Sequence, residues 1–186
     1  QGGMANFARI VQSLTRPVLD YALPPRCAGC GAIVPEPDRF CTDCWSGLDF
    51  LTSQGCLRCG VPMEIPGQVC APCMAEPPRH DGVRAAVAYG DVARQVALKL
   101  KHGRRIGLSR LMAKSMSRRL PEDAALLIPV PLHRWRIWHR GFNQSMLVAR
   151  HLSASSGLPA LSAILTRKKA TPMLGGLGRK ERAKAV

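Results

Sequence analysis

Residues 126–144, Leu-Leu-Ile-Pro-Val-Pro-Leu-His-Arg-Trp-Arg-Ile-Trp-His-Arg-Gly-Phe-Asn-Gln, decide how the second half of this chain is interpreted. The apolar run 124–130 predicts a short buried strand, and Pro129 and Pro131 end it because proline donates no ladder hydrogen bond. A basic loop follows, and an amphipathic helix is expected to begin near Gln144. In α/β sheets, this order of strand, loop and helix builds anion sites at the carboxyl ends of strands. The stretch is therefore a candidate phosphate site.

Charge is unevenly distributed along the 186 residues, whose formal net charge is +15. Residues 1–80 contain 6 Lys and Arg against 7 Asp and Glu, whereas residues 81–186 contain 21 against 5. This asymmetry indicates a polyanionic partner, which could be nucleic acid, a phosphate-rich metabolite or an acidic lipid. A solvated basic face is the alternative interpretation. Hydrophobic residues make up 46% of the chain, which excludes global disorder.

The N-terminal segment is predicted to form a helix over residues 1–22. Its apolar residues recur at spacings of three and four, which is typical of a helix face that packs against another element; they are Phe7, Ile10, Val11, Leu14, Val18 and Tyr21. No segment reaches the roughly 18 apolar residues of a membrane span. The pattern of a secretory signal peptide is also missing, so we expect a cytoplasmic protein without a membrane span.

All eight cysteines lie in the region predicted as the second domain, residues 23–78. They form four Cys-x-x-Cys pairs: Cys27/Cys30, Cys41/Cys44, Cys56/Cys59 and Cys70/Cys73. The second two pairs repeat the first two at a shift of 29 residues, and Gly31 and Gly60 follow the first pair of each repeat. An internal repeat of this kind predicts two copies of one small unit.

These pairs predict two structural zinc ions. Tetrahedral Zn²⁺ takes four thiolates, and each Cys-x-x-Cys supplies two from one turn. A site closed by four cysteines has no open position for catalysis, so the metal would hold folded a segment too small for its own apolar core. The spacing leaves open whether each site uses consecutive or alternating pairs. Disulfides, which are rare in the cytosol, and an iron–sulfur cluster are the alternatives.

The run Glu76-Pro77-Pro78-Arg79 predicts a linker before a third domain, residues 79–186. There the patterns predict strands or extended segments over 83–89, 124–130 and 160–166, helices over 92–101, 108–120 and 144–155, and a mobile basic loop over 167–176. Helices that alternate with strands predict an α/β fold with a parallel sheet flanked by helices.

Three motifs resemble the ComF family of phosphoribosyltransferase-like proteins. They are Leu-Lys-Leu-Lys-His-Gly at 98–103, Pro-Val-Pro-Leu at 129–132 and Arg-Gly-Phe-Asn-Gln at 140–144, and they follow the paired cysteine knuckles. The resemblance extends from about Leu19 to the end of the sequence. It implies a double zinc ribbon followed by a type I phosphoribosyltransferase domain, in a family linked to competence and DNA uptake.

The resemblance also implies a site for phosphoribosyl pyrophosphate, accompanied by Mg²⁺. The residues it assigns to this ligand are Lys99, Lys101, Pro129, Val130, Pro131, Leu132, His133, Arg140, Asn143, Arg167, Thr171 and Arg179. By this resemblance, residues 129–133 would form the loop that meets pyrophosphate, and Arg140 and Asn143 would brace or extend that loop. Arg167, Thr171 and Arg179 would lie on a loop that closes over the ligand. Arginine suits bidentate phosphate contact, which agrees with this assignment.

The sequence departs from the family in two respects. Leu174 and Ala185 stand where the family usually has Gln and Asn. Members of the family also continue into an Asp-Asp…Thr-Gly-rich loop that holds the 5′-phosphate and ribose. Residues 1–186 of this chain do not include such a loop. The resemblance therefore implies an incomplete transferase domain that is inactive as given.

Three functions remain open at this level. The first is a phosphoribosyltransferase, and the second is an accessory factor that binds single-stranded nucleic acid. For the second, Trp135 and Trp138 would stack on bases among arginines that neutralise phosphates, unless they cap an apolar edge. The third is a docking module whose zinc ribbons bind a DNA-uptake protein such as a helicase.

Overall fold

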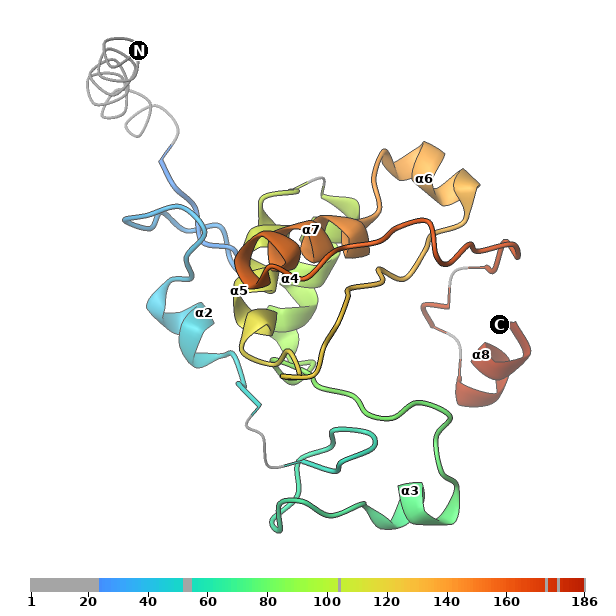
Figure 1. Ribbon diagram of the computed structural model, residues 1–186. Helices are drawn as coiled ribbons and strands as arrows, with labels where there is room; N and C mark the ends of the chain where they lie inside the picture. The colour runs from blue at the N-terminus through green and yellow to red at the C-terminus, as the bar shows by residue number, and fades with distance from the viewer. Residues whose placement is uncertain (1–23, 52–54, 104, 173, 177, 186) are drawn as a thin grey trace. The chain divides into compact units, whose positions relative to one another are not determined.

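The structure is a computed structural model that describes residues 24–51, 55–103, 105–172, 174–176 and 178–185, with the backbone alone at 179 and 183. The helix predicted over residues 1–22 lies outside the described residues. The chain divides into two compact units, one within residues 1–100 and the other within residues 101–186. Figure 1 identifies the elements of both units by colour and label.

The first unit contains the two cysteine repeats, and the structure repeats as the sequence does. Each repeat opens with an isolated antiparallel bridge, Arg26 with Ile33 in the first and Gly55 with Pro62 in the second. Both residues of the second bridge lie 29 positions after those of the first, which is the shift found in the sequence. The prediction of two copies of one small unit is confirmed.

Each repeat then closes with a helix of one turn. The helices are α2 (Thr42–Ser46) and α3 (Ala71–Ala75), again 29 residues apart, and each begins directly after a cysteine. Gly31 and Gly60 adopt positive φ angles of 93° and 72°, a region that glycine enters without steric cost. Their N–H groups donate to the carbonyls of Cys27 and Cys56, which closes the tight turn predicted after each first cysteine pair.

The remainder of the first unit departs from the predicted sheet. The segment predicted as a strand, 83–89, makes one isolated antiparallel bridge, from Val87 to Phe50. Helix α4 (Asp91–His102) follows, close to the predicted bounds, and it buries Val96 and Leu100. In the described part of the unit, this segment therefore pairs with the end of the first repeat and not with a parallel strand.

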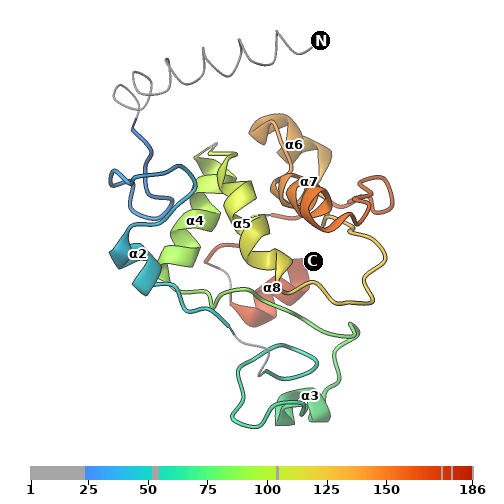
Figure 2. The ribbon, with the colours of Figure 1, turned by 60° about the vertical axis from the view of Figure 1, so that its left-hand side comes forward.

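The second unit is built on two helices, α5 (Leu108–Ser117) and α7 (Gln144–Ser156), which pack against each other (Figure 2). Their buried residues are Leu108, Ser109, Ala113, Val148, Ala149 and Leu152. The side chain of Asn143 accepts a hydrogen bond of 3.0 Å from the Ser145 N–H, which caps α7 at its start. Gly157, at φ 77°, ends it. Both boundaries match the prediction.

The predicted parallel sheet is not confirmed. Among the described residues, parallel pairing is limited to an isolated bridge between Leu127 and Ala160. The Leu127 N–H donates to the Pro159 carbonyl (2.8 Å), and the Leu161 N–H donates to the Leu127 carbonyl (2.9 Å). The pairing does not extend, because Pro129 interrupts one segment and parallel strands are stable only within covered sheets. Leu126 and Ile128 consequently remain 40% exposed.

The loop predicted after Pro131 is wrong in part, because residues Arg134–Arg140 form helix α6. The His133 side chain accepts a hydrogen bond from the Trp135 N–H at its start, and Gly141 ends it with φ 84°. These two caps specify a short helix in a segment that contains no glycine or proline.

Helix α8 (Arg179–Ala185) was not predicted either. No helix in the described ranges is both long and apolar enough to cross a bilayer.

Candidate functional site

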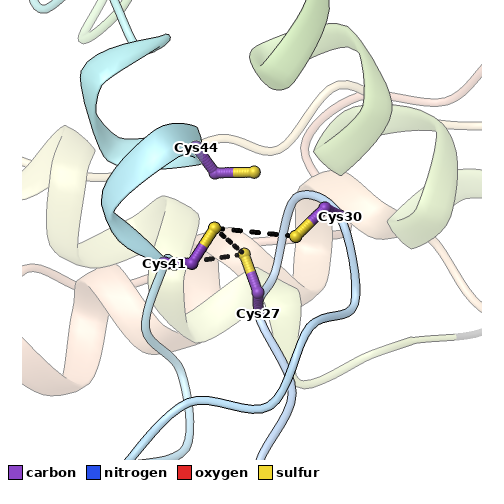
Figure 3. Close-up of side chains that lie close together, drawn as sticks. All are labelled: Cys27, Cys30, Cys41 and Cys44. Atoms are coloured by element: carbon purple, nitrogen blue, oxygen red, sulfur yellow. Dashed lines mark hydrogen bonds between the residues drawn. The ribbon is translucent and has the colours of Figure 1, made fainter.

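The first cysteine tetrad brings four sulfur atoms to one point (Figure 3). Cys27 and Cys30 come from the first turn, whereas Cys41 and Cys44 come from the start of α2. The Cys41 sulfur lies 3.7 Å from that of Cys27 and 3.6 Å from that of Cys30. All four sulfurs lie within 4.8 Å of one another.

The second tetrad has the same construction from Cys56, Cys59, Cys70 and Cys73. Its Cys59 and Cys70 sulfurs lie 3.7 Å apart, and the Cys70 N–H donates to the Cys56 sulfur at 3.3 Å. Each tetrad therefore combines two consecutive pairs, which answers the question that the spacing left open. All eight cysteines are free thiols, so the structure contains no disulfide between them.

The electrostatics of each tetrad favour a bound cation. Burial opposes ionisation of Cys27, but the backbone N–H groups of Cys41, Cys30 and Gly29 outweigh it and lower its pKa to about 6. Backbone N–H groups, first that of Cys70, likewise lower the pKa of Cys56 to about 6. Burial, and then the neighbouring thiols, raise the pKa of the last cysteine in each tetrad, Cys44 and Cys73, to about 12.

Each tetrad thus holds one thiolate near neutral pH and one thiol that ionises only beside a positive charge. Zinc would satisfy both conditions, because Zn–S bonds of about 2.3 Å place tetrahedral sulfurs about 3.8 Å apart. The sulfur distances of 3.6 and 3.7 Å agree with that spacing. Four protein ligands leave no position for a substrate, so the two tetrads are suited to structural zinc.

Lys99, which the sequence assigns to the phosphate site, instead contacts the first tetrad. Its ammonium group donates to the carbonyl of Gly29, in the turn between Cys27 and Cys30. Gly29 is buried, and a Cβ atom there would lie 2.6 Å from the Cys44 sulfur. The corresponding residue of the second repeat is Arg58, whose guanidinium lies 3.9 Å from the Asp81 carboxylate. The first tetrad thus receives a cation from α4, whereas the second tetrad carries a cation, Arg58, within its own turn.

A cavity of about 590 Å³ lies in the second unit, where the predicted phosphate loop meets α6 and α7. Its lining residues are Pro129, Pro131, Leu132, His133, Arg134, Ile137, Asn143, Met146, Ser162, Leu165, Thr166, Arg167 and Lys168. Three of these residues, Arg134, Arg167 and Lys168, carry a permanent positive charge, and none of the described residues that line the cavity is acidic. The cavity is therefore suited to an anion.

Six of the predicted phosphate residues line this cavity: Pro129, Pro131, Leu132, His133, Asn143 and Arg167. The fold thus brings together residues separated by up to 38 positions in the sequence. The Asn143 side chain also donates to the Val130 carbonyl at 3.1 Å, which ties the end of the proline loop to the start of α7. This contact gives Asn143 a bracing role.

Lys101, Val130 and Arg140 are not among the residues that line the cavity. Val130 is 63% exposed, Lys101 is exposed, and the side chain of Arg179 lies outside the described residues. Arg140 donates to the Gln144 side chain at 2.7 Å. Burial, and then the nearby Arg136 guanidinium, lower the pKa of Arg140.

Thr171 does not line the cavity either, but it is buried and holds the segment that follows the cavity residues. The Arg167 guanidinium donates to its hydroxyl at 2.9 Å. Arg136 of α6 donates to its carbonyl at 2.5 Å and to the Pro172 carbonyl at 2.9 Å. The segment predicted as a mobile loop is thereby attached to α6, and Arg136 acts as a positioning residue.

Arg134 and Ile137 lie within the stretch predicted as a phosphate site but were not assigned to the ligand, and Ser162, Thr166 and Lys168 were missed. A signal for the first two was present, since residues three apart share a face of a helix. That signal required the helix that was not predicted. Nothing in the sequence distinguishes Lys168 from its neighbour Lys169.

Residues 18–75 match the family profile described as the double zinc ribbon domain. Competence protein F of Haemophilus influenzae is 27% identical over 169 residues, which cover 84% of this chain and 72% of that protein. DNA utilization protein YhgH of Salmonella typhimurium is 32% identical over 127 residues, 62% of this chain and 55% of the relative. Competence protein ComFC of Bacillus subtilis is 27% identical over 137 residues, 68% and 57% of the two chains. No solved structure matches.

The repeated tetrads and the matching profile make this chain a double zinc ribbon protein. Together with the matches to competence and DNA utilization proteins, they support its similarity to the ComF family. The matched region spans only slightly more than half of two of these relatives.

The tetrads predict a metal content of about two zinc ions per chain. We expect Cys41→Ser and its counterpart Cys70→Ser to lose one zinc ion each, because each substitution removes one of four ligands from one site. Elemental analysis of the purified variants checks this stoichiometry. A wild-type content below one zinc per chain would contradict the assignment.

The contact of Lys99 predicts that this side chain slows the release of zinc from the first tetrad. Zinc bound by four thiolates carries a net negative charge, which the neighbouring ammonium offsets. Lys99→Met should therefore accelerate zinc release from the first tetrad several-fold, measured with a chromogenic chelator in the Cys70→Ser background. Lys101→Met, on the same helix but exposed, is the matched control. Equal rates with and without Lys99→Met in the Cys70→Ser background would refute this role.

Proposed function

We propose that this chain acts in DNA uptake or utilisation and that its second unit binds phosphate-bearing ligands, such as phosphoribosyl pyrophosphate, in the 590 Å³ cavity. The observation that carries the proposal is the cavity lining. It contains three cations, and none of the described residues that line the cavity has a carboxylate. The names of the competence and DNA utilization relatives support the biological context.

The electrostatic setting strengthens this proposal. Residues 101–186 contain 18 Lys and Arg against three acidic residues, Glu122, Asp123 and Glu181. A field of this sign concentrates anions near the surface and accelerates their arrival. At the cavity, Arg167 and Arg134 can contact phosphate oxygens through paired N–H groups, and Lys168 supplies a compact charge.

The residues present account for binding better than for catalysis. Fixed cations beside a pyrophosphate would stabilise the charge that develops when it leaves, as a phosphoribosyltransferase requires. Mg²⁺ would have to be held by the ligand's own oxygens, since no carboxylate lies among the described residues of the cavity. We therefore propose a ligand-binding role and leave transferase activity as a prediction from the family resemblance.

A second candidate function, binding of single-stranded nucleic acid, is favoured by the exposure of α6. Trp138 is 74% exposed and Trp135 is 56% exposed. The two indoles meet edge to face with centroids 6.2 Å apart. Tryptophans that capped an apolar edge would be largely covered, whereas exposed rings among arginines are suited to stacking on bases. A cytoplasmic location and docking of the ribbons to a helicase remain further proposals.

Isothermal titration of the zinc-loaded chain with phosphoribosyl pyrophosphate and Mg²⁺ tests the primary proposal. We expect saturable binding that Lys168→Met and Arg167→Met each weaken by about tenfold, the loss typical of one charge-assisted contact. Arg150→Met removes the same charge from the exposed face of α7 and should leave affinity nearly unchanged. Absence of heat at millimolar ligand would contradict the proposal.

A further inference from the structure

We propose that the cavity binds the terminal phosphate and nucleotide of single-stranded DNA, and that the tryptophan pair of α6 stacks on the bases that follow. The inference rests on the proposed function, because it requires that the cavity binds phosphate. It goes further by naming a strand end as the ligand. It also joins the cavity and α6 into one binding surface.

The cavity has an apolar part as well as a charged one. Beside its cations, the lining includes Leu132, Ile137, Met146 and Leu165 together with two prolines. A nucleotide combines a phosphate with a flat base that apolar side chains bind well. The volume of about 590 Å³ lies within the roughly 300–1,000 Å³ of small-molecule sites. The lining thus has room and apolar surface for a base as well as cations for a phosphate.

The permanent charges among the described residues that line the cavity are all positive. No described residue that lines the cavity is acidic, so nothing there would hold a divalent cation in place. Arg134, Arg167 and Lys168 can instead neutralise a phosphate by direct contact. A terminal phosphate monoester carries more charge than a phosphodiester inside the strand, and it therefore gains more from three cations. Recognition of the strand end should consequently need no magnesium.

Helix α6 contributes one of its faces to the cavity. Arg134 and Ile137 line the cavity and lie three residues apart, which places them on one face of the helix. Trp135 and Trp138 each follow one of them, so their face is rotated by about 100° about the helix axis. A strand that leaves the cavity along α6 would therefore meet the exposed indoles next.

The remaining contacts of α6 hold this surface in place. Arg136 is bonded to the carbonyls of Thr171 and Pro172, and Arg140 is bonded to Gln144. The His139 ring contacts Trp138 edge to face, with centroids 5.0 Å apart. Two cations of α6, Arg136 and Arg140, thus hold the helix in place, whereas Arg134 lines the cavity and can bind phosphate.

Fluorescence anisotropy of the zinc-loaded chain tests this inference. Three oligonucleotides of about 12 bases, a length within the usual range of single-strand sites, carry a 5′-phosphate, a 3′-phosphate or hydroxyls at both ends, with an internal dye. Buffers contain near-physiological salt, no magnesium, and no chelator because a chelator would remove zinc. We expect one phosphorylated strand to bind about tenfold more tightly than the hydroxyl strand.

Three variants separate the cavity from the stacking surface. Lys168→Met, at an exposed position of the cavity, should abolish the preference for the phosphorylated end. Lys114→Met removes the same charge from α5 and should keep the preference. Trp138→Ala should weaken all three oligonucleotides alike, and Trp138→Phe should restore most of that loss.

Equal affinity for all three strands would overturn the inference, as would a preference that persists in Lys168→Met. A parallel titration with inorganic pyrophosphate separates the two proposals. Pyrophosphate binding without an end preference would refute the strand-end inference and leave the proposed function intact. Absence of both would refute both proposals.

Discussion

Convergence of four sulfur atoms on one point is the interaction on which the first unit depends. The buried apolar residues of its two repeats are Cys27, Ala28, Val34, Cys44 and Cys56, so the cysteines themselves form most of the core. A core this small cannot offset the conformational entropy of some fifty residues. Metal–thiolate bonds can, and this accounts for two complete tetrads in a region with little other apolar packing.

The second unit is stabilised differently, and the function proposed for it depends on that difference. Packing of α5 against α7 fixes the start of α7, where Asn143 braces the proline loop against the helix. The cavity forms where these elements meet α6 and the segment that Arg136 attaches through Thr171. Cations held on a packed framework lose little freedom when a phosphate binds, so the framework favours affinity.

The sequence predicted local features better than pairing between distant segments. Zinc ligands, the 29-residue repeat and the bounds of α7 were predictable, because spacing and caps are encoded within a few residues. The parallel sheet was not, because an apolar run such as 124–130 does not specify its partners. Helix α6 was missed since its caps, His133 and Gly141, resemble loop residues until the helix between them is considered. Lys99 was assigned to phosphate from the family resemblance, and its contact with Gly29 could not be predicted because the two residues lie 70 positions apart.

The central claim is that phosphate binds in the cavity and not diffusely on a basic surface. The most direct measurement is a nuclear magnetic resonance titration of the isotope-labelled, zinc-loaded chain with inorganic pyrophosphate. The account predicts saturable amide shifts concentrated at residues 132–134, 143 and 166–168, which line the cavity. Shifts spread evenly over the basic residues of α5 and α8, or no shifts at all, would contradict it.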